Sequence, residues 1–108
     1  VDKNKILIRD ACYNVMGWSN YYVKDKFRFS DWFKAVLKPE IDNPDPRLKL
    51  LRFRAAWVVG KWVEEIESDI RPLVYETITR LFSDKDIVLR LTAVMVLKNC
   101  MWICEKTF

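Results

Sequence analysis

Three segments of this chain resemble one another, and their spacing constrains the fold more than any single residue does. Ile8-Arg9, Leu51-Arg52 and Leu89-Arg90 can be placed in register with offsets of 43 and then 38 residues. The same register aligns Leu7 with Leu50 and Val88, Cys12 with Ala55 and Ala93, Val15 with Val58 and Val96, and Met16 with Val59 and Leu97. A repeat of roughly 40 residues with this pattern is typical of stacked helical pairs. Arrays of such pairs normally present a binding surface.

The composition agrees with one folded domain in a reducing compartment. The 108 residues are 51% hydrophobic, which is enough for one core, and the net charge of +4 is spread along the chain. This mild surplus of positive charge has two explanations, a solvated surface with a chance excess of lysine or an acidic binding partner. The cysteines at positions 12, 100 and 104 form neither a disulfide framework nor a zinc motif. With no signal peptide and no long apolar run, we expect cytosol or nucleus and no membrane insertion.

Helical periodicity with intervening turn residues predicts an all-α chain. The five expected helices cover about residues 4–22, 31–41, 46–66, 70–82 and 85–104. The third is apolar almost all round, which predicts burial between neighbours on several sides. The first carries Leu7, Ile8, Cys12, Val15 and Met16 on one side.

Residues at the helix ends carry signals of their own. Ser30 and Asp31 can accept the free amides that open the second helix, and Pro39 should kink or end it. Asp45 is a plausible cap for the third helix, with Pro46 as its first residue. For the last two helices we expect Asp69 as a cap and a capping box from Ser83 to Asp86.

Two patterns alternate along the chain, in the order B, A, B, A, B. The A pattern repeats at an offset of 41 residues, which carries Trp32, Phe33, Val36 and Leu37 onto Leu73, Val74, Thr77 and Ile78. We therefore expect about two and a half hairpins of a right-handed α-α superhelix of the HEAT type. Neither end carries a polar cap, and the chain opens on Val1 without a methionine, so we expect the whole of residues 1–108 to be a segment of a longer array.

Arginines recur at equivalent positions of the B pattern, as Arg9, Arg52 and Arg90. In helical-repeat arrays such an arginine commonly pairs with an aspartate of an interhelical turn, which forms a ladder along the stack. The expected acceptors are Asp45, Asp84 and Asp86. Gly17 and Gly60 also share a repeat position, and glycine inside a helix costs roughly 1 kcal/mol relative to alanine, so close packing of a neighbour is expected there.

The residue types argue against catalysis and against cofactor binding. Histidine is absent, and two glycines cannot build a phosphate-binding loop. Nucleic-acid binding is also disfavoured, because it needs a contiguous row of phosphate contacts. The basic residues Arg54 and Lys61 of the third helix become Thr92 and Asn99 in the fifth, so the basic strip does not repeat.

Several stretches together resemble the importin-β (karyopherin-β) family of nuclear transport receptors. They are Ile8–Ala11, Asp31–Phe33, Trp57–Trp62, Ser68–Glu76 and Leu81–Arg90. The resemblance extends from about Ile6 to Lys98 and is similar to interior repeats of the family. It implies a superhelical receptor that carries protein cargo, contacts phenylalanine-glycine nucleoporins and responds to the GTPase Ran, moving between cytoplasm and nucleus.

The resemblance also suggests where partners would bind. A cargo surface would involve Arg54, Lys61 and Glu65 on an inward-facing B helix, and nucleoporin phenylalanines would insert near Trp32 and Phe82. No Ran-binding residue is carried over, because the family's main Ran contacts lie in N-terminal repeats. Two alternatives stay open: a helical-repeat scaffold of another assembly, such as a phosphatase or coat complex, and a DNA-binding helical-repeat protein.

Overall fold

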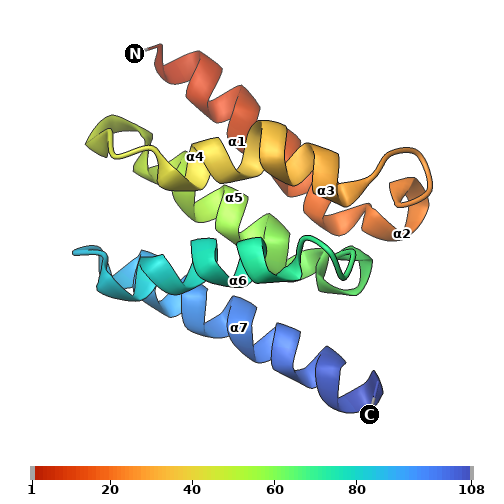
Figure 1. Ribbon diagram of the computed structural model, residues 1–108. Coiled ribbons are helices and arrows are strands. Elements are labelled where there is room, and N and C mark those ends of the chain that lie inside the picture. The colour runs from red at the N-terminus through yellow and green to blue at the C-terminus, as the bar shows by residue number, and fades with distance from the viewer. Residues whose placement is uncertain (1, 108) are drawn as a thin grey trace.

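The computed structural model describes residues 2–107, with side chains described as far as residue 103. Every regular element in that range is helical, which confirms the predicted all-α class. The helices form two layers in a slab with extents of 44, 32 and 19 Å (Figure 1). This arrangement is the one expected of an array of stacked helical pairs.

One layer contains the three B helices side by side, with α5 between α1 and α7 (Figure 1). Their bounds are Lys3–Trp18 for α1, Lys49–Lys61 for α5 and Ile87–Thr107 for α7. A short helix α2 (Asn20–Val23) follows α1, and α5 lies between two 3-10 turns, η2 (Pro46–Leu48) and η3 (Val63–Glu65). The expected single helices over residues 4–22 and 46–66 are therefore each interrupted.

The second layer contains two A segments, each of which leads into the next B helix. The first A segment runs through α3 (Phe29–Trp32), the π-helical turn η1 (Phe33–Leu37) and α4 (Lys38–Asp42). The second A segment consists of α6 (Arg71–Thr79) and the 3-10 turn η4 (Arg80–Ser83). Figure 1 shows the two A segments stacked in front of the B helices.

Pro39 does not end its helix. It lies in the first turn of α4, directly after the π-helical turn η1. A proline interrupts the regular hydrogen bonds of an α-helix, and a wider turn is one way for the chain to continue through it. The A segment therefore remains helical as far as Asp42.

Three of the expected helix caps differ in the structure. The amide of Ser30 donates to the carboxylate of Glu67 at 3.1 Å. The acceptor for this free amide at the start of α3 therefore comes from the loop that precedes α6, and neither Ser30 nor Asp31 caps the helix. Asp69 does not cap α6, which follows Ile70 without a side-chain cap. At α7, Asp86 accepts from the amide of Val88 at 2.7 Å, and Ser83 takes no part. Only the cap by Asp45, which accepts from the amide of Arg47 at 2.9 Å, lies where the sequence predicts it.

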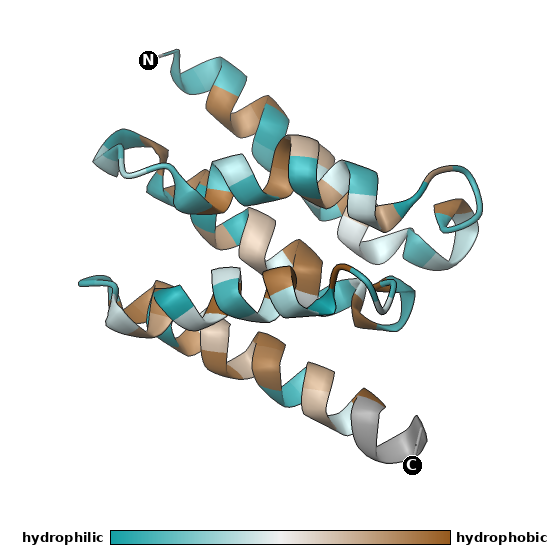
Figure 2. Cartoon of the chain, viewed as in Figure 1, coloured by the Kyte–Doolittle hydropathy of each residue, from teal (hydrophilic) through white to brown (hydrophobic). Residues whose placement is uncertain are grey.

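The core lies between the two layers. Its largest fully buried side chain is Trp62, which packs in an aromatic cluster with Phe27, Phe29 and Trp32. One face of α5 and its C-terminal cap is fully buried and consists of Leu51, Ala55, Val58, Val59 and Trp62. Figure 2 shows the apolar segments of α5 and α7 against the A layer. None of the helices within residues 2–107 is long and apolar enough to span a membrane.

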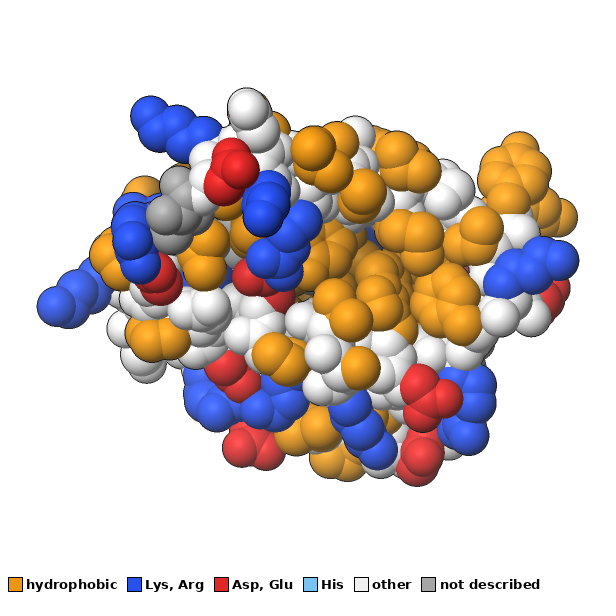
Figure 3. Space-filling model, turned by 90° about the horizontal axis from the view of Figure 1, so that it is seen from above, with side chains coloured by type: hydrophobic (Ala, Val, Ile, Leu, Met, Phe, Trp, Pro, Cys, Tyr) orange, Lys and Arg blue, Asp and Glu red, His pale blue; other side chains and the backbone are white. Residues whose placement is uncertain are grey.

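The equivalent repeat positions in α1 are exposed or only partly buried. Ile8 is 63% exposed, whereas its equivalents Leu51 and Leu89 are fully buried. Each of α5 and α7 packs against the A segment that precedes it, and no A segment precedes α1 among the described residues. The apolar side chains therefore gather on the free face above α1 (Figure 3). The buried residues of α1 are instead Tyr13, which contacts Glu40 of α4, and Gly17, which lies against Trp57 of α5.

We expect Gly17→Ala to lower the free energy of unfolding by about 1–3 kcal/mol, because a Cβ at this position would overlap the ring of Trp57. Helix propensity alone would favour the alanine by roughly 1 kcal/mol. Urea denaturation followed by circular dichroism measures the change.

Gly60→Ala is the matched control for this variant. Its Cβ would lie 3.2 Å from Cγ2 of Val96, which is tight but open to a small shift. We expect the propensity gain of roughly 1 kcal/mol to offset that contact and leave stability close to wild type. Equal losses at both glycines would contradict this account of the close packing.

Candidate functional site

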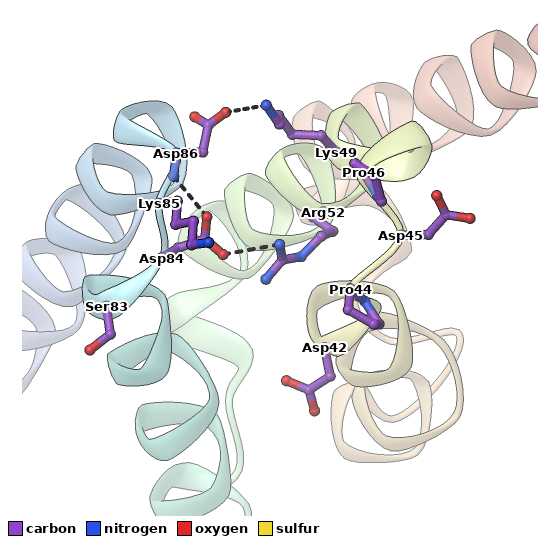
Figure 4. A pocket seen from close by; sticks show the side chains of 10 residues that line it. All are labelled: Asp42, Pro44, Asp45, Pro46, Lys49, Arg52, Ser83, Asp84, Lys85 and Asp86. Carbon is purple, nitrogen blue, oxygen red and sulfur yellow. Dashed lines mark hydrogen bonds and ion pairs between the residues drawn. The ribbon is translucent and has the colours of Figure 1, made fainter.

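The turns between A segments and B helices lie next to one another at one edge of the array. A hollow of about 560 Å³ separates them, and Figure 4 shows the side chains that line it. The two turns repeat the same hydrogen bonds. Asn43 accepts from the amide of Asp45 at 3.0 Å, and Asp84 accepts from the amide of Asp86 at 2.9 Å. Asp45 and Asp86 then each cap the helical turn that follows.

Arg52 links the two turns across the hollow. Its Nη1 lies 3.0 Å from a carboxylate oxygen of Asp84 (Figure 4). Its Nε donates to the carbonyl of Ile41 at 2.8 Å. The backbone amide of Asp86, followed by the charge of Arg52, holds the pKa of Asp84 below its ordinary value. The structure thus brings together one pair of the expected ladder, and the guanidinium joins the first A segment to the turn before α7.

Two further ion pairs cross the same edge. Lys49 of α5 lies 2.7 Å from Asp86 and lowers the pKa of that carboxyl group, and Arg80 of η4 lies 3.4 Å from Asp42. The side chains of Lys49 and Arg80 are each about half exposed, so these pairs exchange readily with solvent.

The other expected members of the ladder have different partners. Arg9 pairs with Glu40 rather than with an aspartate, because the turn position equivalent to Asp84 is the neutral Asn43. Arg90 donates to the carbonyls of Asp84 and Lys85 at 2.8 and 3.1 Å. Asp45 pairs with Arg47, two residues away, which holds the pKa of Asp45 at about 2.

A buried polar group joins α1 to α4. The carboxylate of Glu40 is almost fully buried and accepts from the Tyr13 hydroxyl at 3.0 Å as well as from Arg9. Burial, together with the charge of Glu40, raises the pKa of Tyr13 to about 12. The repeat register does not predict these contacts, because Tyr13 and Glu40 lie outside the aligned repeat positions.

Arg54, the first residue of the expected cargo strip, is occupied by contacts within the array. Its Nε lies 2.8 Å from Asp10 of α1, and its guanidinium lies 4.9 Å from the centre of the Trp57 ring. Both members of the ion pair are about one-fifth exposed. Arg54 therefore links two B helices through Asp10 and Asn14 of α1.

Lys61 and Glu65 lie at the other end of α5. The ammonium of Lys61 lies 4.2 Å from the ring centre of Trp18, a side chain that is 65% exposed. Glu65 lies 3.9 Å from Lys24 in the link after α2. Lys61 and Trp18 thus form an accessible cation-aromatic pair. Lys61 also lies 5.5 Å from the ring centre of Trp57, so it shares this aromatic partner with Arg54, whereas Glu65 pairs with Lys24.

The two residues expected to face nucleoporins differ in their surroundings. Trp32 packs edge-on against Phe27 and Trp62, at ring separations of 5.4 Å, and belongs to the aromatic core. Phe82 is 40% exposed and lines an apolar hollow beside α7. Its equivalent one repeat earlier, Ile41, is fully buried, so a following helical pair would cover Phe82.

A row of exposed aliphatic residues was missed as a surface, although the repeat register contains it. Leu7, Leu50 and Val88 occupy one position in three B helices and are 59%, 39% and 48% exposed. Leu50 belongs to α5, which has a B helix on each side, so its exposure does not depend on a missing neighbour. With Phe53, Leu50 and Val88 line a hollow of about 270 Å³ between α5 and α7. We call Leu7, Leu50 and Val88 the aliphatic row.

We expect Arg52→Lys to destabilise the protein by about 1–3 kcal/mol, because an ammonium cannot reproduce the planar fork that reaches both Ile41 and Asp84. Thermal and urea unfolding measure the loss. Arg47→Lys is the control: its pair with Asp45 is exposed and local, so the stability should change by less than about 0.5 kcal/mol. Similar losses for both variants would exclude a special role for Arg52.

We expect the stability to fall as the pH rises from about 10 to about 12, because folded Tyr13 keeps a proton that the unfolded chain loses. The stabilisation is complete below pH 10 and corresponds to about 2–3 kcal/mol. Urea unfolding at each pH should show a clearly smaller fall in Tyr13→Phe than in the wild type; the remainder comes from lysine ion pairs such as Lys49–Asp86, which lose their charge over the same range. Tyr22→Phe alters an exposed tyrosine and should retain the wild-type dependence; a wild-type profile for Tyr13→Phe would refute the assignment.

Comparison with known proteins agrees with the helical-repeat arrangement and with the family that the sequence resembles. The chain is 40% identical to importin-11 from Mus musculus and 41% identical to importin-11 from Homo sapiens, over 98 residues in each case. The match covers 90% of this chain, which spans about a tenth of the length of these relatives. No family model and no solved structure matches the chain. Over nearly its whole length the chain is related to a segment of the importin-11 proteins, and this match supports its assignment to the importin-β family.

Proposed function

We propose that this chain is a segment of a nuclear transport receptor that binds protein cargo and nucleoporins under the control of Ran and moves between cytoplasm and nucleus. The observation that carries the proposal is the identity of about 40% to importin-11 over nine-tenths of the chain. The role is one of binding rather than catalysis. The exposed apolar faces of α1 and α7 are covered by further helical pairs of the same receptor.

The cargo surface lies on the exposed side of the B helices. It combines the aliphatic row near their N-terminal ends with the Lys61–Trp18 pair near the end of α5. The row offers apolar contacts at each repeat, and the hollow beside Leu50 accepts a side chain of the partner. Arg54 supports this surface by joining α1 to α5, and Glu65 lies at its rim.

Nucleoporin phenylalanines insert between neighbouring A segments in this proposal. Phe82 contributes to such a site together with residues of the next helical pair, because its own hollow is open on that side. Trp32 contributes only its outer edge, since most of its ring packs in the core.

Ran acts through the shape of the array. Each helical pair contacts only its neighbours, so small changes in packing angle add along the solenoid and alter its curvature. In this segment, the half-exposed pairs Lys49–Asp86 and Arg80–Asp42 can break and re-form as the turns move. The buried centre of α5 remains a rigid spacer.

The test uses the full-length receptor that contains this chain, immobilised and incubated with Ran and with cytosolic protein. We expect Ran loaded with GTP to bind in strong preference to Ran loaded with GDP, and to release bound cargo. A helical-repeat scaffold of another assembly would show no preference for the nucleotide state, and that result would overturn the proposal. Salt-sensitive binding to duplex DNA would favour the DNA-binding alternative.

Leu50→Glu tests the cargo surface in the same assay. A carboxylate in the hollow between α5 and α7 should weaken the capture of cargo that Ran-GTP releases, while Ran binding itself stays unchanged. Arg47→Glu introduces the same side chain at an exposed position outside the hollow and should behave as wild type. Unchanged capture by Leu50→Glu would remove the aliphatic row from the proposed surface.

A further inference from the structure

We infer that Ser83 is a phosphorylation site for protein kinases that select acidic residues after the target. Ser83 is the last residue of η4, its side chain is exposed, and no hydrogen bond occupies its hydroxyl among the interactions of the described residues. Figure 4 shows the hydroxyl at the rim of the hollow, directed away from Arg52. The residue is therefore open to a modifying enzyme.

The sequence around Ser83 distinguishes it from the other hydroxyl residues. It is followed by Asp84, Lys85 and Asp86, which places carboxylates one and three positions after the target. No other serine or threonine up to Thr92 has a carboxylate three positions after it. Kinases of this class carry basic residues that pair with such carboxylates, so complementary charge favours binding here.

The carboxylate at the third position is 17% exposed and has two partners, the amide of Val88 and the ammonium of Lys49. Asp86 is held by Lys49, whose side chain is about half exposed, and a pair of this kind contributes little stability. The cations of a kinase can therefore replace Lys49. In the transfer itself, the Ser83 oxygen bonds to the γ-phosphorus of ATP, the bond to the bridging oxygen breaks, ADP leaves, and the hydroxyl proton passes to a base of the kinase.

The internal repeat indicates that Ser83 stays exposed when further helical pairs follow. Its equivalent in the first A segment is Asp42, 41 residues earlier, and each is the last residue of its A segment. Asp42 remains exposed although the second A segment packs beside it, and its carboxylate receives Arg80 from that neighbour. This repeat position therefore already holds an anion, the carboxylate of Asp42, in the first A segment. A phosphate on Ser83 would place an anion at the same position of the second A segment.

Phosphorylation would change the charge of the hollow. Its rim holds four carboxylates, on Asp42, Asp45, Asp84 and Asp86, and three cations, on Lys49, Arg52 and Lys85. A phosphate adds about −1.5 to −2 charges at neutral pH. The net charge of these lining side chains would change from −1 to about −2.5 to −3.

Incubation of the chain with an acidophilic serine/threonine kinase and ATP tests the inference. We expect mass spectrometry to find a single phosphate, on Ser83. Ser83→Ala should abolish incorporation, and Asp86→Asn should reduce it strongly while still capping α7, because asparagine is an equally good cap. Ser68→Ala is the matched control, since Ser68 is also exposed and precedes an aspartate but has an arginine three positions later.

A peptide covering residues 79–88 separates the sequence motif from the fold. A phosphorylated peptide with an unmodified chain would show that the fold protects Ser83, and this would overturn the inference. An unmodified peptide, or incorporation that persists in Ser83→Ala, would overturn it as well.

Discussion

The packing of Trp62 is the interaction on which the rest of the structure depends. Its indole is fully buried at the end of α5, and its Nε1 donates to the carbonyl of Met16 in α1 at 2.9 Å. Its ring lies 5.3 Å from that of Phe27 and 5.4 Å from that of Trp32. One side chain thus joins two neighbouring B helices to the A segment between them. The register of α1 against α5 follows from it, including the stacking of Lys61 over Trp18.

The repeat register predicts much of this fold because it reflects a recurring physical need. In α5 and α7 a small residue and the aliphatic residue three positions later pack against an A segment and are fully buried, as Ala55 and Ala93, Val58 and Val96. The class and the two-layer stacking could therefore be derived from the sequence. The ends of helices could not, since they depend on distant groups. Glu67 accepts a hydrogen bond from the amide of Ser30, which lies 37 residues away in the sequence, and no local sequence pattern predicts such a contact.

The arginine positions could also be predicted, whereas their partners could not all be. A repeat register says where a guanidinium lies, but its acceptor depends on the residue that each copy happens to hold. Asn43 and Asp84 make the same hydrogen bond within their turns, yet only Asp84 carries the charge that attracts Arg52. Where the charge is missing, Arg9 turns to Glu40 instead. The shared hydrogen bonds preserve the turn while the ion pairs vary.

Exposure in a repeat segment has two physical origins, and comparison between copies separates them. Ile8 is exposed only in α1, because the helix that covers Leu51 and Leu89 has no counterpart there among the described residues. Leu7, its neighbour in sequence, belongs to a position that is exposed in every copy, including the one with B helices on both sides. Burial would stabilise either side chain by a similar amount, so hydrophobicity alone does not distinguish them. The exposure of an apolar side chain in α5 cannot be attributed to a missing neighbour. The aliphatic row is for this reason a stronger candidate for a partner surface than the larger apolar face of α1.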